Sequence, residues 1–141
     1  MDANEFFSAI IGKGRKKSSK ALDIFFSGNA LLFAPLWLLD EFENNKGEIM
    51  EKAGFSNKEF DSFINGISSR ITFIPLAMYA NRATDAMELS PHKKDKEYFA
   101  LALKLGAPIW SEEKAFKKQP VVQVFNTQEL YDKLFMAKHP N

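Results

Sequence analysis

The stretch DKEYFALALKLGAPIW, residues 95–110, joins a helix to a strand and decides the class of fold. It begins with Asp95, an acid at the position where the helix dipole favours negative charge. Gly106 then ends the helix, as glycine commonly does in a left-handed cap. The residues APIW that follow form a short apolar run of the kind found in buried strands. The stretch therefore predicts one helix–strand unit of an α/β protein.

Similar apolar runs recur on both sides of this unit. ALLFAP (30–35), ITFIP (71–75) and VVQVF (121–125) predict three further strands. Helices are expected at 20–28, 35–55, from 57 onward, 75–89 and 127–137, with a short turn or helix at 114–119. Ser56 with Glu59, and Asn126 with Glu129, form capping-box patterns for two of these helices. The alternation favours a three-layer α/β/α sandwich with a mainly parallel central sheet, in one domain spanning residues 1–141.

The composition excludes several classes of site. The chain has 141 residues, no cysteine, and 19 basic against 18 acidic side chains. Without cysteine there can be no disulfide, thiolate zinc site or cysteine nucleophile. No apolar run reaches the roughly 20 residues that span a bilayer, and in EFFSAIIGKGRKK the charges follow the apolar part, the reverse of a secretory signal. These features predict a soluble cytoplasmic protein with no membrane attachment.

Four carboxylates are expected near the carboxyl ends of strands, where open α/β sheets bind ligands. They are Asp2, if it follows a first strand, Glu41, Asp95, and Glu113 beside Glu112. An all-oxygen cluster without His or Cys suits Mg²⁺ or Mn²⁺, which can activate water and offset the charge of a phosphodiester transition state. Each acid taken singly is also explained as an ordinary capping or solubilising residue.

Several blocks of the sequence together resemble a PIN domain. These blocks are DANEFFSAIIGKG, FAPLWLLDEFENNK, SNKEFDSF, ITFIP and, above all, DKEYFALALKLGAPIWSEEKAFKKQPVVQVFNTQEL. They are most similar to the small stand-alone PIN proteins of archaea, in which an Asp opens a helix reading like YFALAL and the next strand ends in Trp-Ser. The resemblance spans nearly the whole chain. It implies a fold related to that of the 5′-nucleases and a metal-dependent ribonuclease whose products carry a 5′-phosphate and a 3′-hydroxyl.

The resemblance also assigns roles to individual residues. The catalytic carboxylates that hold one or two Mg²⁺ or Mn²⁺ ions would be Asp2, Glu41, Asp95 and Glu113. Asn4 would help to order the metal site, and Ser111 would position metal-bound water or phosphate.

Basic residues near these acids are candidate contacts for RNA phosphates. They are Arg15, Lys16 and Lys17 in one loop, and Lys114, Lys117 and Lys118 after the last acid. The alternative is that they are solvated surface residues. Many relatives are toxins neutralised by a small antitoxin and form homodimers, so the resemblance implies these partners as well as RNA.

Two departures from the family pattern favour an alternative function. Glu113 stands where the family usually has Asp, and the extra methylene can move a carboxylate by about an ångström, which can cost ~10²-fold in rate. A hydrophobic strand normally precedes the first acid, whereas here only Met1 precedes Asp2. Either the chain starts late relative to the natural gene product, or this strand is absent. The alternative is a catalytically weak PIN-like module that binds RNA or a protein partner.

Overall fold

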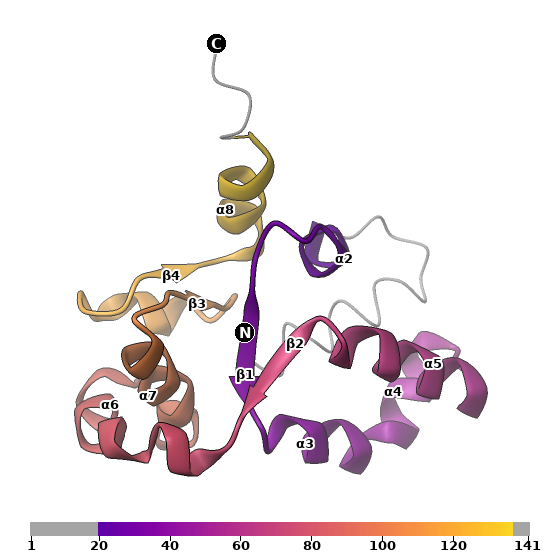
Figure 1. Cartoon of the computed structure of the whole chain (residues 1–141), viewed down its shortest axis with the longest axis horizontal. Coiled ribbons are helices and arrows are strands. Elements are labelled where there is room, and N and C mark those ends of the chain that lie inside the picture. The colour runs from indigo at the N-terminus through magenta and orange to yellow at the C-terminus, as the bar shows by residue number, and fades with distance from the viewer. Residues whose placement is uncertain (1–19, 137–141) are drawn as a thin grey trace.

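Short parallel strands organise the part of the chain that the computed structural model describes, residues 20–136. Strand β1 (Leu32–Pro35) pairs with β2 (Ile71–Ile74), and β3 (Ile109–Trp110) pairs with β4 (Val124–Phe125). Both pairs are parallel, as expected, but they form two separate two-stranded sheets (Figure 1). One continuous sheet at the centre of a three-layer sandwich is therefore not formed by residues 20–136. Asp2, Asn4, Arg15, Lys16 and Lys17 lie outside the described residues.

Helices and single turns connect the strands. The helices are α2 (Lys20–Phe26), α3 (Leu38–Asn44), α4 (Lys46–Ala53), α5 (Asn57–Ser68), α6 (Ala83–Leu89), α7 (Lys96–Leu105) and α8 (Thr127–Tyr131). The shorter turns are η1 (Leu76–Met78), η2 (Ala80–Arg82), η3 (Lys93–Asp95), η4 (Lys114–Lys118) and η5 (Asp132–Met136). The chain therefore alternates between helix and strand as the sequence predicts.

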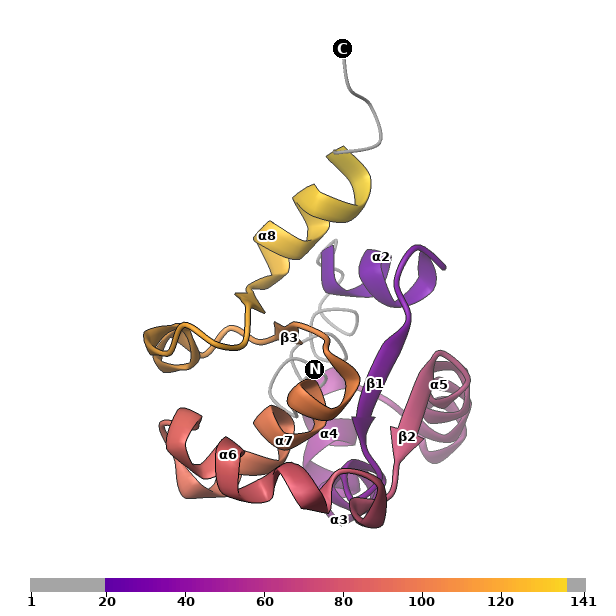
Figure 2. The same cartoon turned by 60° about the vertical axis from the view of Figure 1, so that its left-hand side comes forward.

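Helix α7 has the bounds that its sequence predicts. Asp95 is its N-cap residue, and Gly106 ends it with φ at 63°, in the left-handed region that glycine adopts without strain. The buried side chains of α7 include Tyr98, Phe99 and Leu101, and the helix packs on both β1 and β3 (Figure 2). Full burial of side chains of this size contributes about 1.5–3 kcal/mol each. This one helix therefore connects the two strand pairs.

Both capping boxes predicted from the sequence are present. Ser56 Oγ accepts from Glu59 N at 3.2 Å, and Glu59 Oε1 accepts from Ser56 N at 3.1 Å, at the start of α5. Asn126 Oδ1 accepts from Glu129 N at 2.8 Å, and Glu129 Oε1 accepts from Asn126 N at 2.9 Å, at the start of α8. Each box satisfies two backbone donors that a helix end leaves without partners.

The single helix expected over residues 35–55 is wrong, because the chain breaks at Asn45 into α3 and α4. Asn45 has φ −105° and ψ 13°, outside the helical region. Its side-chain Nδ2 donates to Glu41 O at 2.7 Å. Asparagine side chains compete with the backbone for such carbonyls, and Gly47 just beyond is a poor helix former. The Asn-Asn-Lys-Gly segment thus turns the chain.

The continuous helix expected over residues 75–89 is also wrong, since η1 and η2 precede the short helix α6. Tyr79 separates the two turns with φ −127° and ψ 3°. Its side chain is 1% exposed, and its hydroxyl donates to Glu97 Oε1 at 2.7 Å. Burial and this hydrogen bond raise the pKa of Tyr79, which keeps it a donor. Anchoring this ring against α7 overrides local helix propensity.

The buried apolar side chains form two clusters that meet at Trp37. The first cluster contains Phe25 and Trp110, whose ring centroids are 5.3 Å apart. The second contains Phe99 and Phe116, whose centroids are 5.0 Å apart. Trp37 packs against both clusters. Within residues 20–136 no helix is long and apolar enough to cross a membrane.

The two tryptophans should respond differently to loss of the indole N–H. Trp110 Nε1 donates to Thr127 Oγ1 at 3.0 Å, whereas Trp37 Nε1 is buried and has no hydrogen-bond partner among residues 20–136. Both Trp→Phe changes remove similar volume, but only Trp110→Phe also breaks a hydrogen bond. We expect Trp110→Phe to lower the free energy of unfolding by about 1 kcal/mol more than Trp37→Phe, measured by urea denaturation. Equal losses would contradict the assignment of that bond.

Candidate active site

A polar hollow of about 380 Å³ lies where β3 and β4 end. Its lining residues are Ser111, Glu112, Glu113, Lys114, Lys117 and Asn126. Because the two strands are parallel, their carboxyl ends meet at one edge, which is the edge that binds ligands in α/β sheets. The acids and lysines that follow APIW in the sequence are thus gathered at the expected end of this strand pair.

Ser111 fixes the backbone at this edge. Its side chain is 1% exposed, its N–H donates to Phe125 O at 3.0 Å, and its Oγ accepts from Glu113 N at 3.0 Å. The buried hydroxyl therefore holds the peptide that carries the second glutamate. The role that the resemblance implies for Ser111, positioning metal-bound water or phosphate, stays a prediction.

The two adjacent glutamates have different surroundings. Glu112 Oε1 accepts from the backbone N–H of Thr127, the first residue of α8, at 2.7 Å. Thr127 Oγ1 in turn accepts from Trp110 Nε1, so Glu112 belongs to a structural junction between β3 and α8. The carboxylate of Glu113 is exposed and makes no hydrogen bond or ion pair with any residue from 20 to 136. Of the pair, Glu113 is the one whose oxygens are available to a ligand.

The lysines of the hollow also differ. Lys117 Nζ pairs with Glu129 Oε1, an oxygen that also accepts from Asn126 N. The backbone N–H of Asn126, followed by Lys117, lowers the pKa of Glu129. Lys114 and Lys118 are exposed and form no ion pair with a residue in the described range. Lys117 was predicted as a phosphate contact, but its charge is already paired, which leaves Lys114 and Lys118 as the better candidates.

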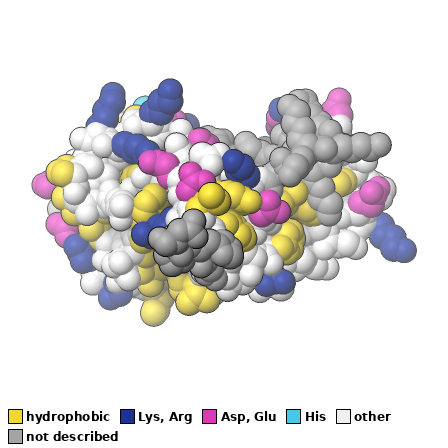
Figure 3. Space-filling view, turned by 90° about the horizontal axis from the view of Figure 1, so that it is seen from above, with side chains coloured by type: hydrophobic (Ala, Val, Ile, Leu, Met, Phe, Trp, Pro, Cys, Tyr) yellow, Lys and Arg dark blue, Asp and Glu magenta, His cyan; other side chains and the backbone are white. Residues whose placement is uncertain are grey.

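Charges of both signs are interspersed over the face shown in Figure 3. The described side chains on that face form no continuous basic stripe, so a nucleic acid lying over them would meet individual lysines among acids. This agrees with a nearly balanced formal charge of +1 for the whole chain. Binding to phosphates would depend on the positions of a few side chains rather than on the overall field.

Glu41 and Asp95 lie at the beginnings of α3 and α7, and both are half-buried. Although Asp95 is the N-cap residue of α7, its side chain makes no capping hydrogen bond, so capping alone does not explain the acid. Trp37 at the start of α3 and Tyr98 in the first turn of α7 stack with ring centroids 5.8 Å apart. That contact places the two helix starts beside each other.

The carboxylates of residues 20–136 do not form a metal centre among themselves. No group of three His, Asp or Glu side chains in this range is arranged to hold a metal ion. Glu41, Asp95 and Glu113 are therefore not gathered by the described residues, and Asp2 lies outside them. Carboxylate oxygens are suitable ligands for Mg²⁺ or Mn²⁺, but residues 20–136 alone do not bring these acids together into a coordination site.

A family model described as the PIN domain matches residues 1–134. The chain belongs to the PIN domain family. No curated protein and no solved structure gives a match. PIN domains are generally nucleases that act on nucleic acids and typically use divalent metals, and their fold is α/β, in line with the parallel strand pairs and intervening helices. The coarse function is therefore that of a nuclease family.

The two glutamates at the end of β3 should differ in their effect on stability. Glu112→Ala removes the acceptor of Thr127 N, and we expect a loss of about 1 kcal/mol in the free energy of unfolding. Glu113→Ala removes no hydrogen bond or ion pair with residues 20–136 and should stay within about 0.5 kcal/mol of the unsubstituted protein. Denaturant unfolding of both variants measures the difference. A larger loss for Glu113→Ala would reverse the two roles.

The capping carboxylate of Glu129 should make the stability of the protein depend on pH in the acidic range. Because its pKa is lowered from the ordinary value of 4.5, its contribution is present above that pH and is lost as the pH falls through the folded-state pKa. Glu129→Gln should therefore flatten the decline of the melting temperature below pH 4.5. The pKa of Glu59 is lowered in the same way by the backbone N–H of Ser56, so Glu59→Gln should act likewise. The melting temperature of each protein is plotted against pH. If it falls equally steeply below pH 4.5 in the variants and in the unsubstituted protein, this account is contradicted.

Proposed function

We propose that the protein is a metal-dependent endoribonuclease that hydrolyses phosphodiester bonds of RNA. Membership of the PIN domain family supports a nuclease. The observation that carries the proposal for this chain is the contrast between Glu112, tied to α8, and Glu113, exposed at the carboxyl edge of β3 and β4. An acid whose backbone is held by a buried serine and whose carboxylate has no hydrogen bond or ion pair with residues 20–136 is suited to a ligand.

The metal ligands in this proposal are Asp2, Glu41, Asp95 and Glu113, with Asn4 as a supporting polar residue. A bound Mg²⁺ or Mn²⁺ would activate water for attack on phosphorus and offset the charge that develops there. Support for Glu41 and Asp95 comes from the contact between Trp37 and Tyr98, which lie at the starts of the two helices that carry these acids.

The remaining polar residues would bind and position the substrate. Ser111 holds the Glu113 backbone, which limits the directions that the carboxylate can take. Lys114, next along the chain, has no ion-pair partner in residues 20–136 and would contact a phosphate beside the scissile bond. Arg15, Lys16 and Lys17 would extend the phosphate contacts from the loop predicted before α2. The family also suggests a small antitoxin or regulatory protein and a homodimer, neither of which this mechanism requires.

Cleavage of end-labelled single-stranded RNA with Mn²⁺ or Mg²⁺ tests the proposal. Asp95→Asn, Glu41→Gln and Glu113→Gln should each reduce the rate by about 10²-fold or more, because a lost ligand misplaces the metal. Glu112→Gln keeps an oxygen acceptor for Thr127 and is the matched control, expected to retain activity within a few-fold. EDTA should abolish cutting in every case.

Metal-dependent cutting that survives Asp95→Asn would overturn the site. A protein that binds the RNAs without cutting any of them would instead support the second candidate, a catalytically weak module that binds RNA or a protein partner. The observation in its favour is that no three candidate ligands converge within residues 20–136. Circular dichroism melts of each variant separate loss of chemistry from loss of fold.

A further inference from the structure

The turn η4, which carries the lysines that follow Glu113, is anchored to the core. Its Phe116 side chain is 1% exposed, and the Phe116 ring contacts that of Phe99 in α7, with centroids 5.0 Å apart. Phe116 N donates to Glu113 O at 3.1 Å. The turn therefore starts directly at the candidate metal ligand and is held against α7.

The side chain of Gln119 closes the other end of this turn. Its Nε2 donates to Phe116 O at 2.8 Å and to Val122 O at 2.7 Å. Its Oε1 accepts from Val121 N at 3.0 Å and from Val122 N at 2.8 Å. An amide side chain has two donor hydrogens and two acceptor lone pairs, so this one is fully used. The backbone of Gln119 is extended, with φ −104° and ψ 148°, so the side chain replaces helical hydrogen bonds that end here.

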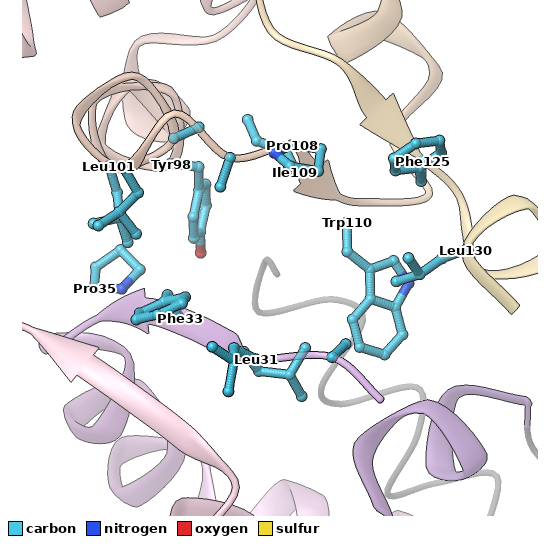
Figure 4. A pocket seen from close by; sticks show the side chains of 15 residues that line it. Leu31, Phe33, Pro35, Tyr98, Leu101, Pro108, Ile109, Trp110, Phe125 and Leu130 are labelled. Atoms are coloured by element: carbon cyan, nitrogen blue, oxygen red, sulfur yellow. The ribbon is translucent and has the colours of Figure 1, made fainter. Parts of the chain in front are cut away.

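An ion pair attaches the same turn to helix α8. Lys117 Nζ pairs with Oε1 of Glu129, which belongs to the capping box of α8. Helix α8 is in turn packed on the strands, since Trp110 of β3 and Leu130 of α8 line one apolar pocket (Figure 4). The turn is thus fixed to α7 through Phe116 and to α8 through Lys117.

These contacts determine which lysines face the polar hollow. A 3₁₀ turn has three residues per turn, so residues three apart share a face. Lys114 and Lys117 are three apart in η4, and both line the hollow beside Glu113. Lys117 is paired with Glu129, whereas Lys114 forms no ion pair with a residue in the described range. The conformation of the turn therefore sets the place of Lys114 relative to Glu113.

We propose that Gln119 is a positioning residue for the RNA substrate, because it holds η4 in the conformation in which Lys114 binds a phosphate beside Glu113. The identity of the ligand rests on the proposed function. Gln119 itself touches neither RNA nor metal. Without it the turn has several conformations, and ordering Lys114 on the phosphate costs binding free energy. Ser111 still holds the backbone of Glu113, so the chemical step is little affected.

The test is binding of a short 5′-fluorescein-labelled single-stranded RNA to the full-length protein, followed by fluorescence anisotropy in EDTA, where nothing is cut. Gln119→Met keeps the length and neutrality of the side chain and makes none of the four hydrogen bonds. We expect affinity to fall at least about fivefold. The slope of log Kd against log salt concentration should fall by about 0.7, the value for one phosphate contact on a single strand.

Three further variants show whether Gln119 acts through Lys114. Lys114→Gln should lower the salt slope by the same amount, and the double variant should lower it no further, because one contact is lost in each case. Gln123→Met is the matched control, since this exposed glutamine makes no side-chain hydrogen bond with residues 20–136, and it should change neither affinity nor slope.

Circular dichroism shows whether each variant is folded at the temperature of binding. If Gln119→Met is not, Gln119→Glu takes its place, because it keeps the acceptors for Val121 N and Val122 N and loses only the two donors. Adding Lys114→Gln to that variant should then leave the slope unchanged. In either variant, hydrogen exchange of the Phe116 amide should speed up as the turn loosens.

Four results would overturn the proposal. They are no RNA binding by the unsubstituted protein, an unchanged slope in the Gln119 variant, an unchanged slope in Lys114→Gln, and a slope in the double variant that falls by the sum of the single effects. The proposed function fails separately, if RNA is bound with the expected pattern but no added metal produces cutting. Where cutting occurs, Gln119→Met should raise KM and leave kcat within a few-fold, and an unchanged KM would overturn the positioning role alone.

Discussion

The described structure depends on the burial of helix α7 against two parallel strand pairs. A two-stranded sheet is at best marginally stable by itself, and parallel strands are normally covered on both faces. The buried face of α7, with Tyr98, Phe99 and Leu101, supplies cover to β1 and to β3 at once. The same helix sets the position of the chemistry, since Asp95 stands at its start and the strand that follows it ends at Ser111.

Local signals in the sequence predicted those parts of the fold whose stabilising contacts are local. The ends of α7 and both capping boxes involve residues a few positions apart, and the structure confirms them. The two broken helices have other causes. Asn45 bonds back to the preceding turn, and Tyr79 is held by Glu97, 18 residues further along the chain. Helical periodicity contains no information about a partner that distant.

The candidate site shows the same division. The sequence placed acids and lysines after β3, and the structure gathers them in one hollow. The sequence alone does not distinguish the bonded carboxylate of Glu112 from the exposed one of Glu113, because that difference depends on where Thr127 lies in space. The ion pair between Lys117 and Glu129 is likewise not predictable from the sequence. Asn126 also lines the hollow, but its sequence pattern indicates only a helix cap and does not show that it lies at the end of β4 beside the acids.

The relation between the two strand pairs bears on where the candidate ligands lie. β1 leads into α3, which carries Glu41, and β3 leads to Glu113. Carboxylates that follow different strands meet at one edge when those strands share a sheet. Within residues 20–136 the two pairs are separate sheets, which accounts for the absence of a three-carboxylate cluster among these residues.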